Sequence, residues 1–417
     1  ILFLLIIHRY SSKMKTALSF LLIVLIMGLF IVFIPRVFSY TPQNVFFLNQ
    51  SFSNIAKNDI IPYLQLMERK WISEQLQIQA LDKHFLIDKK ALSIQWNLSQ
   101  IKKGLLQRKN QNQHVPLFFS WNENKVVEAL HFIAEKTNLT PQDASQKDER
   151  IIRSITGYRL NLANAIDEIR NRLSQGLDNI VIKSYEILNP TIDTKTLLQS
   201  LGFQHLLARY ETSLVEKDEN TRFNIDKGAK SVDGYILEKG EIFSFNRIVG
   251  PADKDDGYLE TKVVVNGKLV PGYGGGVCQV SSTLYNALLQ CDAKIIERSS
   301  HSGYSETTSY VEPGLDAAVS FGYKDLKFSF PQQRIGIFTY VYSDRLVAEI
   351  WGEKEFSRIK SIMSQIQSIT DNGDSEAFIE VETTVLKNDI VEKRYKDRYL
   401  IPKEYAETLK EQIDKNQ

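Results

Sequence analysis

The feature that most constrains this chain is an apolar run near its start, TALSFLLIVLIMGLFIVFI at residues 16–34. The run contains no charged residue, and as a helix rising about 1.5 Å per residue it is long enough to cross a hydrocarbon core of roughly 30 Å. Lys13 and Lys15 precede it, which predicts an N-terminus in the cytoplasm. Everything after Arg36 is therefore expected outside the cytoplasmic membrane.

Two interpretations of this run remain open. As a signal peptide it would be cut after Ser39, with Val37 as the second small residue of the cleavage site, and the protein would be secreted. The apolar stretch is long for a signal peptide, which favours an uncleaved helix that anchors the chain in the membrane. The sequence opens with Ile and not with Met. Met14 is therefore a candidate start residue, and residues 1–13 would then be a reading-frame artefact.

The composition is that of an ordinary globular protein. Hydrophobic residues make up 43% and charged residues 24% of 417 residues, enough for two or three domains. The formal net charge of +1 gives no reason to expect a nucleic-acid partner. Neither a zinc-type cysteine cluster nor a Walker motif occurs in the sequence, so no metal or organic cofactor is predicted. The oligomeric state is not predicted.

Hydrophobic periodicity predicts an α+β fold class with an N-terminal membrane helix, one or two small α+β units, and a β-rich domain containing a helix with a cysteine at its N-terminus. An alternating run at 74–81 predicts a strand, and the segment after Glu353 predicts a helix. The predicted divisions are a cytoplasmic start with anchor or signal peptide at 1–40, an α+β unit at 41–120, a second α+β domain at 121–215, a β-rich domain at 220–355, and a helix with a short β extension at 356–417.

The stretch PGYGGGVCQVSSTLYNALLQ, residues 271–290, places Cys278 between a glycine turn and a predicted helix. A helix N-terminus has free N–H groups and a positive dipole end, which lower a thiol pKa and can stabilise an oxyanion. The second cysteine, Cys291, is predicted at the opposite end of this helix, roughly 20 Å away. Since a disulfide requires Cα atoms within about 7 Å, we predict two free thiols, with Cys291 in the core.

A cysteine nucleophile usually needs a base. Of six histidines, only His301 falls in the 220–355 region, and the intervening chain is long enough to bring it back beside Cys278. Asp316 and Glu312 are candidates to orient the imidazole, and Arg298 could add positive charge. The alternative is a small buried cysteine after a purely structural turn.

The stretch from Arg222 to Gly352 resembles the VanW family of bacterial envelope proteins, and the region 121–195 is similar to the peptidoglycan-binding domain that often precedes VanW domains. The motif that carries the first resemblance is the glycines followed by Cys-Gln-Val-Ser and Thr-Leu-Tyr-Asn. Matching segments are RFNI (222–225), GYILEKGEIFSFNRIVGP (234–251), DGYLE (256–260), GGGVCQVSSTLYNALL (274–289), IERSSHS (296–302), YVEPGLDAAVSFGYKDLKF (310–328) and WG (351–352).

This resemblance implies an L,D-transpeptidase that makes 3→3 cross-links between peptidoglycan stem peptides, with Cys278 as nucleophile and His301 as catalytic histidine. Many relatives have His-Asn-His-Ser where this chain has SSHS, so Ser299 replaces a histidine while His301 is kept. The family takes its name from vancomycin-resistance clusters, so a link to glycopeptide resistance is also implied. The predicted site comprises the catalytic pair, the oxyanion turn of Gly274, Gly275, Gly276 and Gln279, and the supporting residues Arg298, Ser302, Tyr310 and Asp316.

Two other functions are compatible with the sequence. In the first, the protein is a non-catalytic peptidoglycan-binding or scaffold protein of the cell envelope, and GGGVC is a structural turn. In the second, it is a thiol redox protein, which is disfavoured because no Cys-x-x-Cys pair occurs.

Overall fold

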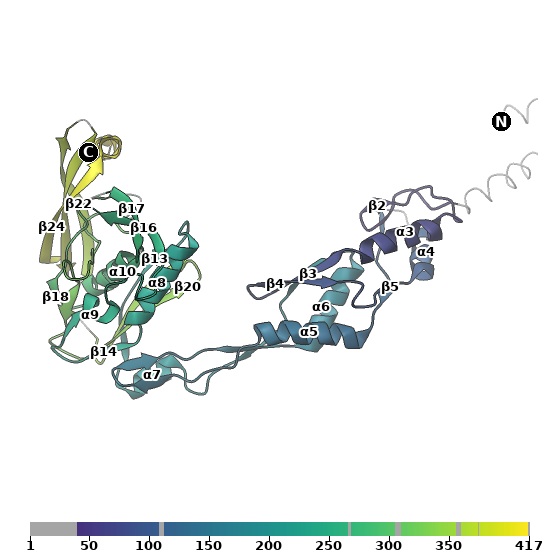
Figure 1. Cartoon of the computed structure of the whole chain (residues 1–417), viewed down its shortest axis with the longest axis horizontal. Helices are drawn as coiled ribbons and strands as arrows, with labels where there is room; N and C mark the ends of the chain where they lie inside the picture. Colours follow the sequence, from purple (N-terminus) through teal and green to yellow (C-terminus); the bar gives the residue numbers. More distant parts are fainter. Residues whose placement is uncertain are drawn as a thin grey trace, which may run out of the picture. The chain divides into compact units, whose positions relative to one another are not determined.

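The computed structural model of the chain describes residues 40–107, 112–265, 268–304, 310–355, 360–373 and 375–415. These residues form two compact units (Figure 1). The first contains the described residues up to Pro141 together with Thr156–Leu188, and the second contains Gln142–Ile155 and the residues from Asn189 onward.

The structure corrects the predicted fold class. The described ranges form a mixed α and β fold, and none of their helices is long and apolar enough to cross a membrane. The predicted membrane helix at 16–34 lies outside the described residues, and it is not part of the fold class that the structure supports.

The first unit packs helices against short strands around a single core. Strand β3 pairs in parallel with β11, so that Ile78 lies opposite Ile180, and both side chains are buried. Residues from both predicted α+β units, 41–120 and 121–215, share this core. The elements are β1 Val45–Phe47, β2 Gln50–Ser51, α3 Ile60–Ile72, β3 Gln75–Ala80, β4 Lys83–Asp88, β5 Gln95–Trp96, α4 Leu98–Leu106, β6 Gln113–Val115, β7 Phe119–Ser120, α5 Glu123–Thr137, β10 Gly157–Leu160, α6 Leu162–Ser174, β11 Asn179–Ile182 and β12 Tyr185–Leu188.

The second unit is built on a six-stranded antiparallel sheet of order β13-β21-β20-β14-β9-β8. A smaller sheet, β15-β19-β18, and the hairpin β16-β17 complete its middle part. The elements are β8 Ser145–Lys147, β9 Arg150–Ile152, α7 Thr194–Ser200, β13 His205–Ser213, α8 Glu219–Val232, β14 Tyr235–Leu237, β15 Ile242–Ser244, α9 Phe245–Val249, β16 Glu260–Val265, β17 Lys268–Tyr273, α10 Val277–Leu289, β18 Lys294–Glu297, β19 Lys327–Ser329, β20 Ile335–Tyr342 and β21 Arg345–Gly352.

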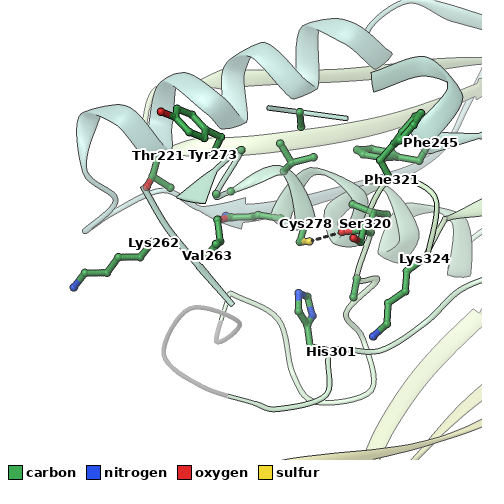
Figure 2. A pocket seen from close by; sticks show the side chains of 18 of the residues that line it. Thr221, Phe245, Lys262, Val263, Tyr273, Cys278, His301, Ser320, Phe321 and Lys324 are labelled. Carbon is green, nitrogen blue, oxygen red and sulfur yellow. Dashed lines mark hydrogen bonds between the residues drawn. The ribbon is translucent and has the colours of Figure 1, made fainter. Parts of the chain in front are cut away.

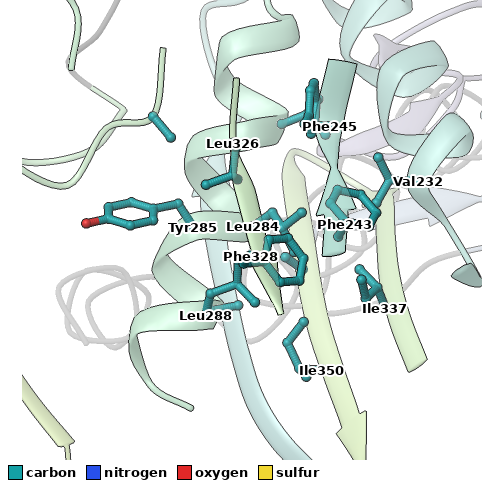
Figure 3. Packing of buried hydrophobic residues seen from close by; sticks show 14 of the residues in the cluster. Val232, Phe243, Phe245, Leu284, Tyr285, Leu288, Leu326, Phe328, Ile337 and Ile350 are labelled. Carbon is teal, nitrogen blue, oxygen red and sulfur yellow. The ribbon is translucent and has the colours of Figure 1, made fainter. Parts of the chain in front are cut away.

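Helix α10 is the central helix of this unit. Leu284 and Leu288 lie one helical turn apart and pack against Phe328 and Ile350 from the two sheets (Figure 3). The helix is buried on nearly every face, so it is held by packing around its whole circumference. This fixes the position and direction of its N-terminus, where Cys278 lies.

The C-terminal residues form a three-stranded antiparallel sheet, β22-β23-β24, followed by a helix. We call these three strands the C-terminal sheet; their bounds are β22 Lys360–Asn372, β23 Glu376–Lys387 and β24 Ile390–Pro402, and the helix is α11 Lys403–Lys415. The helix predicted after Glu353 is therefore wrong. The apolar residues Ile362, Ile366 and Ile369 have the spacing of a helix, but cross-strand pairing with β23 makes residues 360–372 a strand, in which the exposure of successive side chains alternates from 361 to 368.

Candidate functional site

The glycine turn before α10 has a backbone that only glycine adopts easily. Gly276 is the N-cap residue with a φ of 105°, and Gly274 has a φ of 73°, both in the left-handed region. Gly275 has no room for a side chain, because a Cβ there would lie 2.0 Å from the Thr261 hydroxyl oxygen. The turn therefore brings the backbone against β16 and directs the chain into α10 at Cys278.

Cys278 is half-buried, and its Sγ lies 3.4 Å from the Val319 carbonyl oxygen, to which the thiol donates. Figure 2 shows the imidazole of His301 directed toward this sulfur across the pocket. The two residues are 23 positions apart in the sequence (301 − 278). After α10, the chain runs back through β18 and so brings His301 close to the N-terminus of the helix. The structure thus brings the predicted pair together.

His301 is held on its other side by Asp316. The Nδ1 atom lies 2.6 Å from Asp316 Oδ2, and the His301 backbone N–H donates to the same oxygen over 2.7 Å. Because Nδ1 is engaged by the carboxylate, Nε2 is the ring nitrogen left to face Cys278. The arrangement is a Cys–His–Asp series in which a buried carboxylate orients the imidazole.

The pKa values of this series are shifted in opposite directions. Burial raises the pKa of the Cys278 thiol, but its hydrogen bond with His301 and the charge of that ring lower it more, so that the net shift is downward. Burial lowers the pKa of His301, but the Asp316 and Cys278 partners raise it more, to about 10. Proton transfer from the thiol to the imidazole is therefore favoured, because the thiol pKa falls while the imidazole pKa rises.

Asp316 keeps its negative charge for similar reasons. Its burial raises the carboxyl pKa, whereas the hydrogen bond with His301 and the charges of His301 and Arg298 lower it more, so that the pKa falls below its ordinary value. Arg298 Nη2 lies 3.1 Å from Asp316 Oδ1, and the Tyr399 hydroxyl donates to the same oxygen over 2.6 Å. The carboxylate is satisfied on both oxygens.

A pocket with a cavity volume of about 730 Å³ opens over Cys278. Its floor is the glycine turn and the start of α10, and His301 lies opposite (Figure 2). Polar, charged and aromatic groups share the walls; those at the rim include Lys217, Lys262, Lys324, Phe321 and Tyr323. A peptide-sized substrate can therefore reach the sulfur from solvent.

The backbone N–H groups of the turn differ in whether they already donate a hydrogen bond within the protein. Val277 N–H donates to the Gly274 carbonyl, and Gln279 N–H donates to the Gly276 carbonyl. In the described ranges, the Cys278 amide has no hydrogen-bond acceptor. The Gln279 side chain donates to Thr212 and Ser213 of β13, away from the pocket. Among the described residues the Gly275 and Gly276 amides likewise have no acceptor, so Cys278 supplies one of the free amides, and Gln279 fixes α10 to the sheet.

The remaining predicted residues occupy distinct places. Ser302 is exposed at the pocket, and Tyr310 lines it. The Tyr310 hydroxyl is buried, and none of the described residues forms a hydrogen bond with it. Glu312 is exposed and makes no hydrogen bond to His301, so Asp316 is the residue that orients the imidazole.

Two residues that contact this network, Asp397 and Tyr399, were not predicted from the sequence. Both lie on β24, in a segment that was expected to be an appendage. A strand with polar residues at every second position also describes an exposed edge, so the sequence contains no signal that would have singled them out.

Across all described ranges, no group of three or more His, Cys, Asp or Glu side chains is arranged to hold a metal ion. Both cysteines are free thiols, as predicted. The described side chains at this site supply a thiol, an imidazole and hydroxyl groups, and the turn supplies backbone amides.

Comparison with known proteins identifies the class to which this site belongs. Residues 220–351 match the family described as "VanW like protein", and residues 78–181 match the family described as "Putative peptidoglycan binding domain". The second match extends across residue 120, where two separate units were predicted, in agreement with the shared core of the first unit. These matches assign a VanW-like domain to residues 220–351 and a peptidoglycan-binding-type domain to residues 78–181, which confirms the resemblance found from the sequence.

Two curated proteins are similar to this chain. One is "Uncharacterized protein YoaR" of Bacillus subtilis, 37% identical over 154 residues, which are 37% of this chain and 49% of that protein. The other is "Vancomycin B-type resistance protein VanW" of Enterococcus faecalis, 33% identical over 168 residues, which are 39% of this chain and 61% of that protein. The chain thus spans between about half and three fifths of these relatives. No solved structure matches it.

The two domain matches together support a cell-wall-associated protein that lies outside the cytoplasm. Attachment to a membrane through an N-terminal helix has no support from the described residues.

Proposed function

We propose that this protein is a cysteine-dependent L,D-transpeptidase that cross-links peptidoglycan stem peptides. The observation that carries the proposal is the Cys278–His301–Asp316 series at the floor of an open pocket, in a chain that also has a peptidoglycan-binding-type domain. A buried carboxylate that orients an imidazole toward a thiol at a helix N-terminus is the arrangement that an acyl-transferring cysteine needs.

In the first half-reaction, the Cys278 thiolate attacks the carbonyl carbon of the third residue of a donor tetrapeptide. The C–N bond to the terminal D-residue breaks, and the His301 imidazolium gives its proton to the leaving amine. The products are a thioester on Cys278 and the free D-amino acid, with His301 now neutral.

In the second half-reaction, an amine of a neighbouring stem peptide attacks the thioester carbonyl. His301 takes the proton that this amine loses, and the C–S bond breaks to return the thiolate. The new amide bond joins the two stems in a 3→3 cross-link. If water attacks in place of the amine, the same steps give hydrolysis.

Both half-reactions pass through a tetrahedral oxyanion, for which two donors are available. The first is the free amide of Cys278, where the positive end of the α10 dipole adds to the effect. The second is the hydroxyl of Tyr310. Burial and then the negative charge of Cys278 raise its pKa well above the ordinary value, so it remains a protonated donor at neutral pH. Its ring lies 5.7 Å from the Lys217 ammonium, which faces it from the loop after β13.

The test is to incubate the purified full chain with disaccharide-tetrapeptides and to examine the products by mass spectrometry. The wild type is expected to give cross-linked dimers with release of the terminal D-residue, and Cys278→Ala is expected to give neither. Cys291→Ala is the matched control, because it removes the other thiol at a site sealed from solvent. Equal product patterns for wild type and Cys278→Ala would overturn the proposal.

A second candidate function is peptidoglycan binding without catalysis. The match of residues 78–181 to a peptidoglycan-binding-type domain favours it. In that case the full chain would sediment with purified cell walls, Cys278→Ala would bind equally well, and neither protein would change the stem peptides.

A further inference from the structure

We propose that the C-terminal sheet is a positioning element for catalysis, which fixes both Asp316 and the segment that carries His301. This inference rests on the proposed function, since it concerns the same Cys278 and His301. The family match ends at residue 351, so the whole C-terminal sheet lies beyond the matched domain. Its role is therefore not given by that match.

The first contact is made by Tyr399 of β24. Its hydroxyl donates to Asp316 Oδ1 over 2.6 Å and accepts the Gly314 N–H over 2.7 Å. Asp316 Oδ2 is the oxygen that holds His301. Tyr399 thus fixes the rotation of the carboxylate from the side opposite the imidazole, and because the Tyr399 side chain is fully buried, water does not replace it.

The second contact runs through Arg298. Its Nη1 atom lies 2.6 Å from both carboxylate oxygens of Asp397 on β24, while Nε donates to the Asp316 carbonyl over 2.6 Å. The side chains of Arg298 and Asp397 are 4% and 9% exposed, so this is a buried charge pair. Without Asp397 the guanidinium would have one buried carboxylate, that of Asp316, to balance its charge, and the geometry at Asp316 would change.

The third set of contacts holds the backbone on both sides of the site. Leu400 N–H donates to the Ser302 carbonyl over 2.9 Å, and Tyr304 N–H donates to the Leu400 carbonyl over 3.1 Å. On the other side, the Thr383 hydroxyl of β23 donates to the Gly314 carbonyl over 3.2 Å. The segment just after His301 and the segment just before Asp316 are therefore both tied to the same sheet.

These contacts predict a specific consequence for the thiol. Asp316 raises the pKa of His301, and His301 in turn lowers the pKa of Cys278, so a disturbed carboxylate weakens the whole series. The charged or titratable groups that act on His301 are Asp316 and Cys278, and those that act on Cys278 are His301, Asp316 and Tyr310. The groups around Asp316 are His301, Arg298, Tyr285, Tyr304, Tyr310 and Tyr399. If the C-terminal sheet contributed only to stability, loss of these contacts would leave the pKa of the Cys278 thiol unchanged.

The experiment compares Tyr399→Phe and Asp397→Asn with the wild type in the full chain. The rate of Cys278 alkylation by iodoacetamide is measured against pH by intact mass, and kcat and KM are measured for donor-peptide turnover. Each variant is expected to raise the apparent thiol pKa by about one unit, which slows alkylation by up to about 10-fold at pH values below the wild-type thiol pKa, and to lower kcat about 10-fold or more with KM unchanged. Matched controls are Tyr342→Phe, at an exposed tyrosine of β20, and Asp389→Asn, at the exposed tip before β24.

The outcomes separate the two proposals. If both variants alkylate with the wild-type pH profile while the wild type is active, the positioning role is overturned and the proposed function stands. If the wild type makes no product but the variants shift the thiol titration as expected, the positioning role stands and the transpeptidase proposal fails. Thermal unfolding is recorded in parallel, and all rates are taken below the midpoint of the least stable variant.

Discussion

The two ends of helix α10 carry the same residue type in opposite environments. At the N-terminal end, Cys278 lies in an open pocket beside His301. At the other end, Cys291 is 1% exposed, packs in the core, and its Sγ lies 3.3 Å from the Ala287 carbonyl. The two residues are thirteen positions apart (291 − 278): Cys278 is the second residue of α10, and Cys291 lies two positions beyond its last residue, Leu289.

The difference shows that cysteine chemistry is set by surroundings and not by residue type. The helix dipole favours a negative charge at its N-terminus and disfavours one at its C-terminus. Cys278 also has a cationic partner and a path to solvent, whereas Cys291 is buried in the core and has no path to solvent. The following predictions test this contrast, beginning with the largest effect.

Replacement of Cys278 by alanine is expected to abolish product formation and iodoacetamide labelling together. The reason is that the other thiol is sealed in the core and cannot take over. Peptide mapping of the labelled wild type should find the adduct at Cys278 alone. Labelling of Cys291 at a comparable rate would contradict the contrast between the two ends of the helix.

Replacement of His301 by glutamine is expected to lower kcat by roughly 10²–10⁴-fold, the usual range for loss of a positioned acid–base group. The substitution keeps a polar side chain of similar length, so the fold should be preserved. Turnover of the donor peptide is the measurement, and unchanged circular dichroism is the control. A loss below about 10-fold would show that the imidazole does not transfer the proton.

The pH dependence of alkylation gives the sign of the interaction between the two residues. Because the Cys278 pKa is lowered, the wild type should react well below the ~8.5 of a free thiol. Because the His301 pKa is raised to about 10, the pair should persist through neutral pH and be lost as the pH rises past that value. In His301→Gln the reaction should need a higher pH. Coincident profiles would refute the ion pair.

Replacement of Tyr310 by phenylalanine is expected to reduce kcat by about 10–100-fold, since one oxyanion donor is removed. Alkylation by iodoacetamide forms no oxyanion, so its rate and pH profile should stay close to those of the wild type. The two assays thus separate oxyanion stabilisation from thiolate formation. If turnover is unchanged, the Cys278 amide is the sufficient donor.

Replacement of Cys291 by alanine is expected to have the smallest effect of these changes and to lower only the stability of the fold. The expected loss is about 1–2 kcal/mol, because removal of a small buried side chain leaves a small cavity. The free energy of unfolding from a urea titration measures this, and kcat of the folded protein should be unaffected. A loss of activity in the folded variant would mean that the two ends of α10 are coupled.

Much of the site could be predicted from local sequence. Gly274 and Gly276 are required by their positive φ and Gly275 by its close approach to Thr261, and the helix that follows has the spacing of a buried helix. The pairing of Cys278 with His301 followed from the one histidine in the domain and the length of chain between them. The choice between Glu312 and Asp316 did not, since both are acidic residues in the same loop and only packing shows which one is buried.

The first unit and the C-terminal region show where local patterns fail. Two α+β units were expected across residues 41–215, but the parallel pairing of β3 with β11 joins distant segments into one core. Residues 360–372 were expected to form a helix, and cross-strand pairing makes them a strand. Both differences arise from contacts between residues far apart in the chain, which periodicity does not report.

The sequence by itself determined the thiol at a helix N-terminus, the absence of a disulfide and the VanW-like domain at residues 220–351, because each depends on neighbouring residues or a short motif. Only the tertiary structure decided that Tyr399 and Asp397 bear on Asp316 and Arg298, from more than eighty positions away along the chain. The physical reason is that a buried carboxylate and guanidinium must find partners, and the strand that supplies them is chosen by packing in three dimensions.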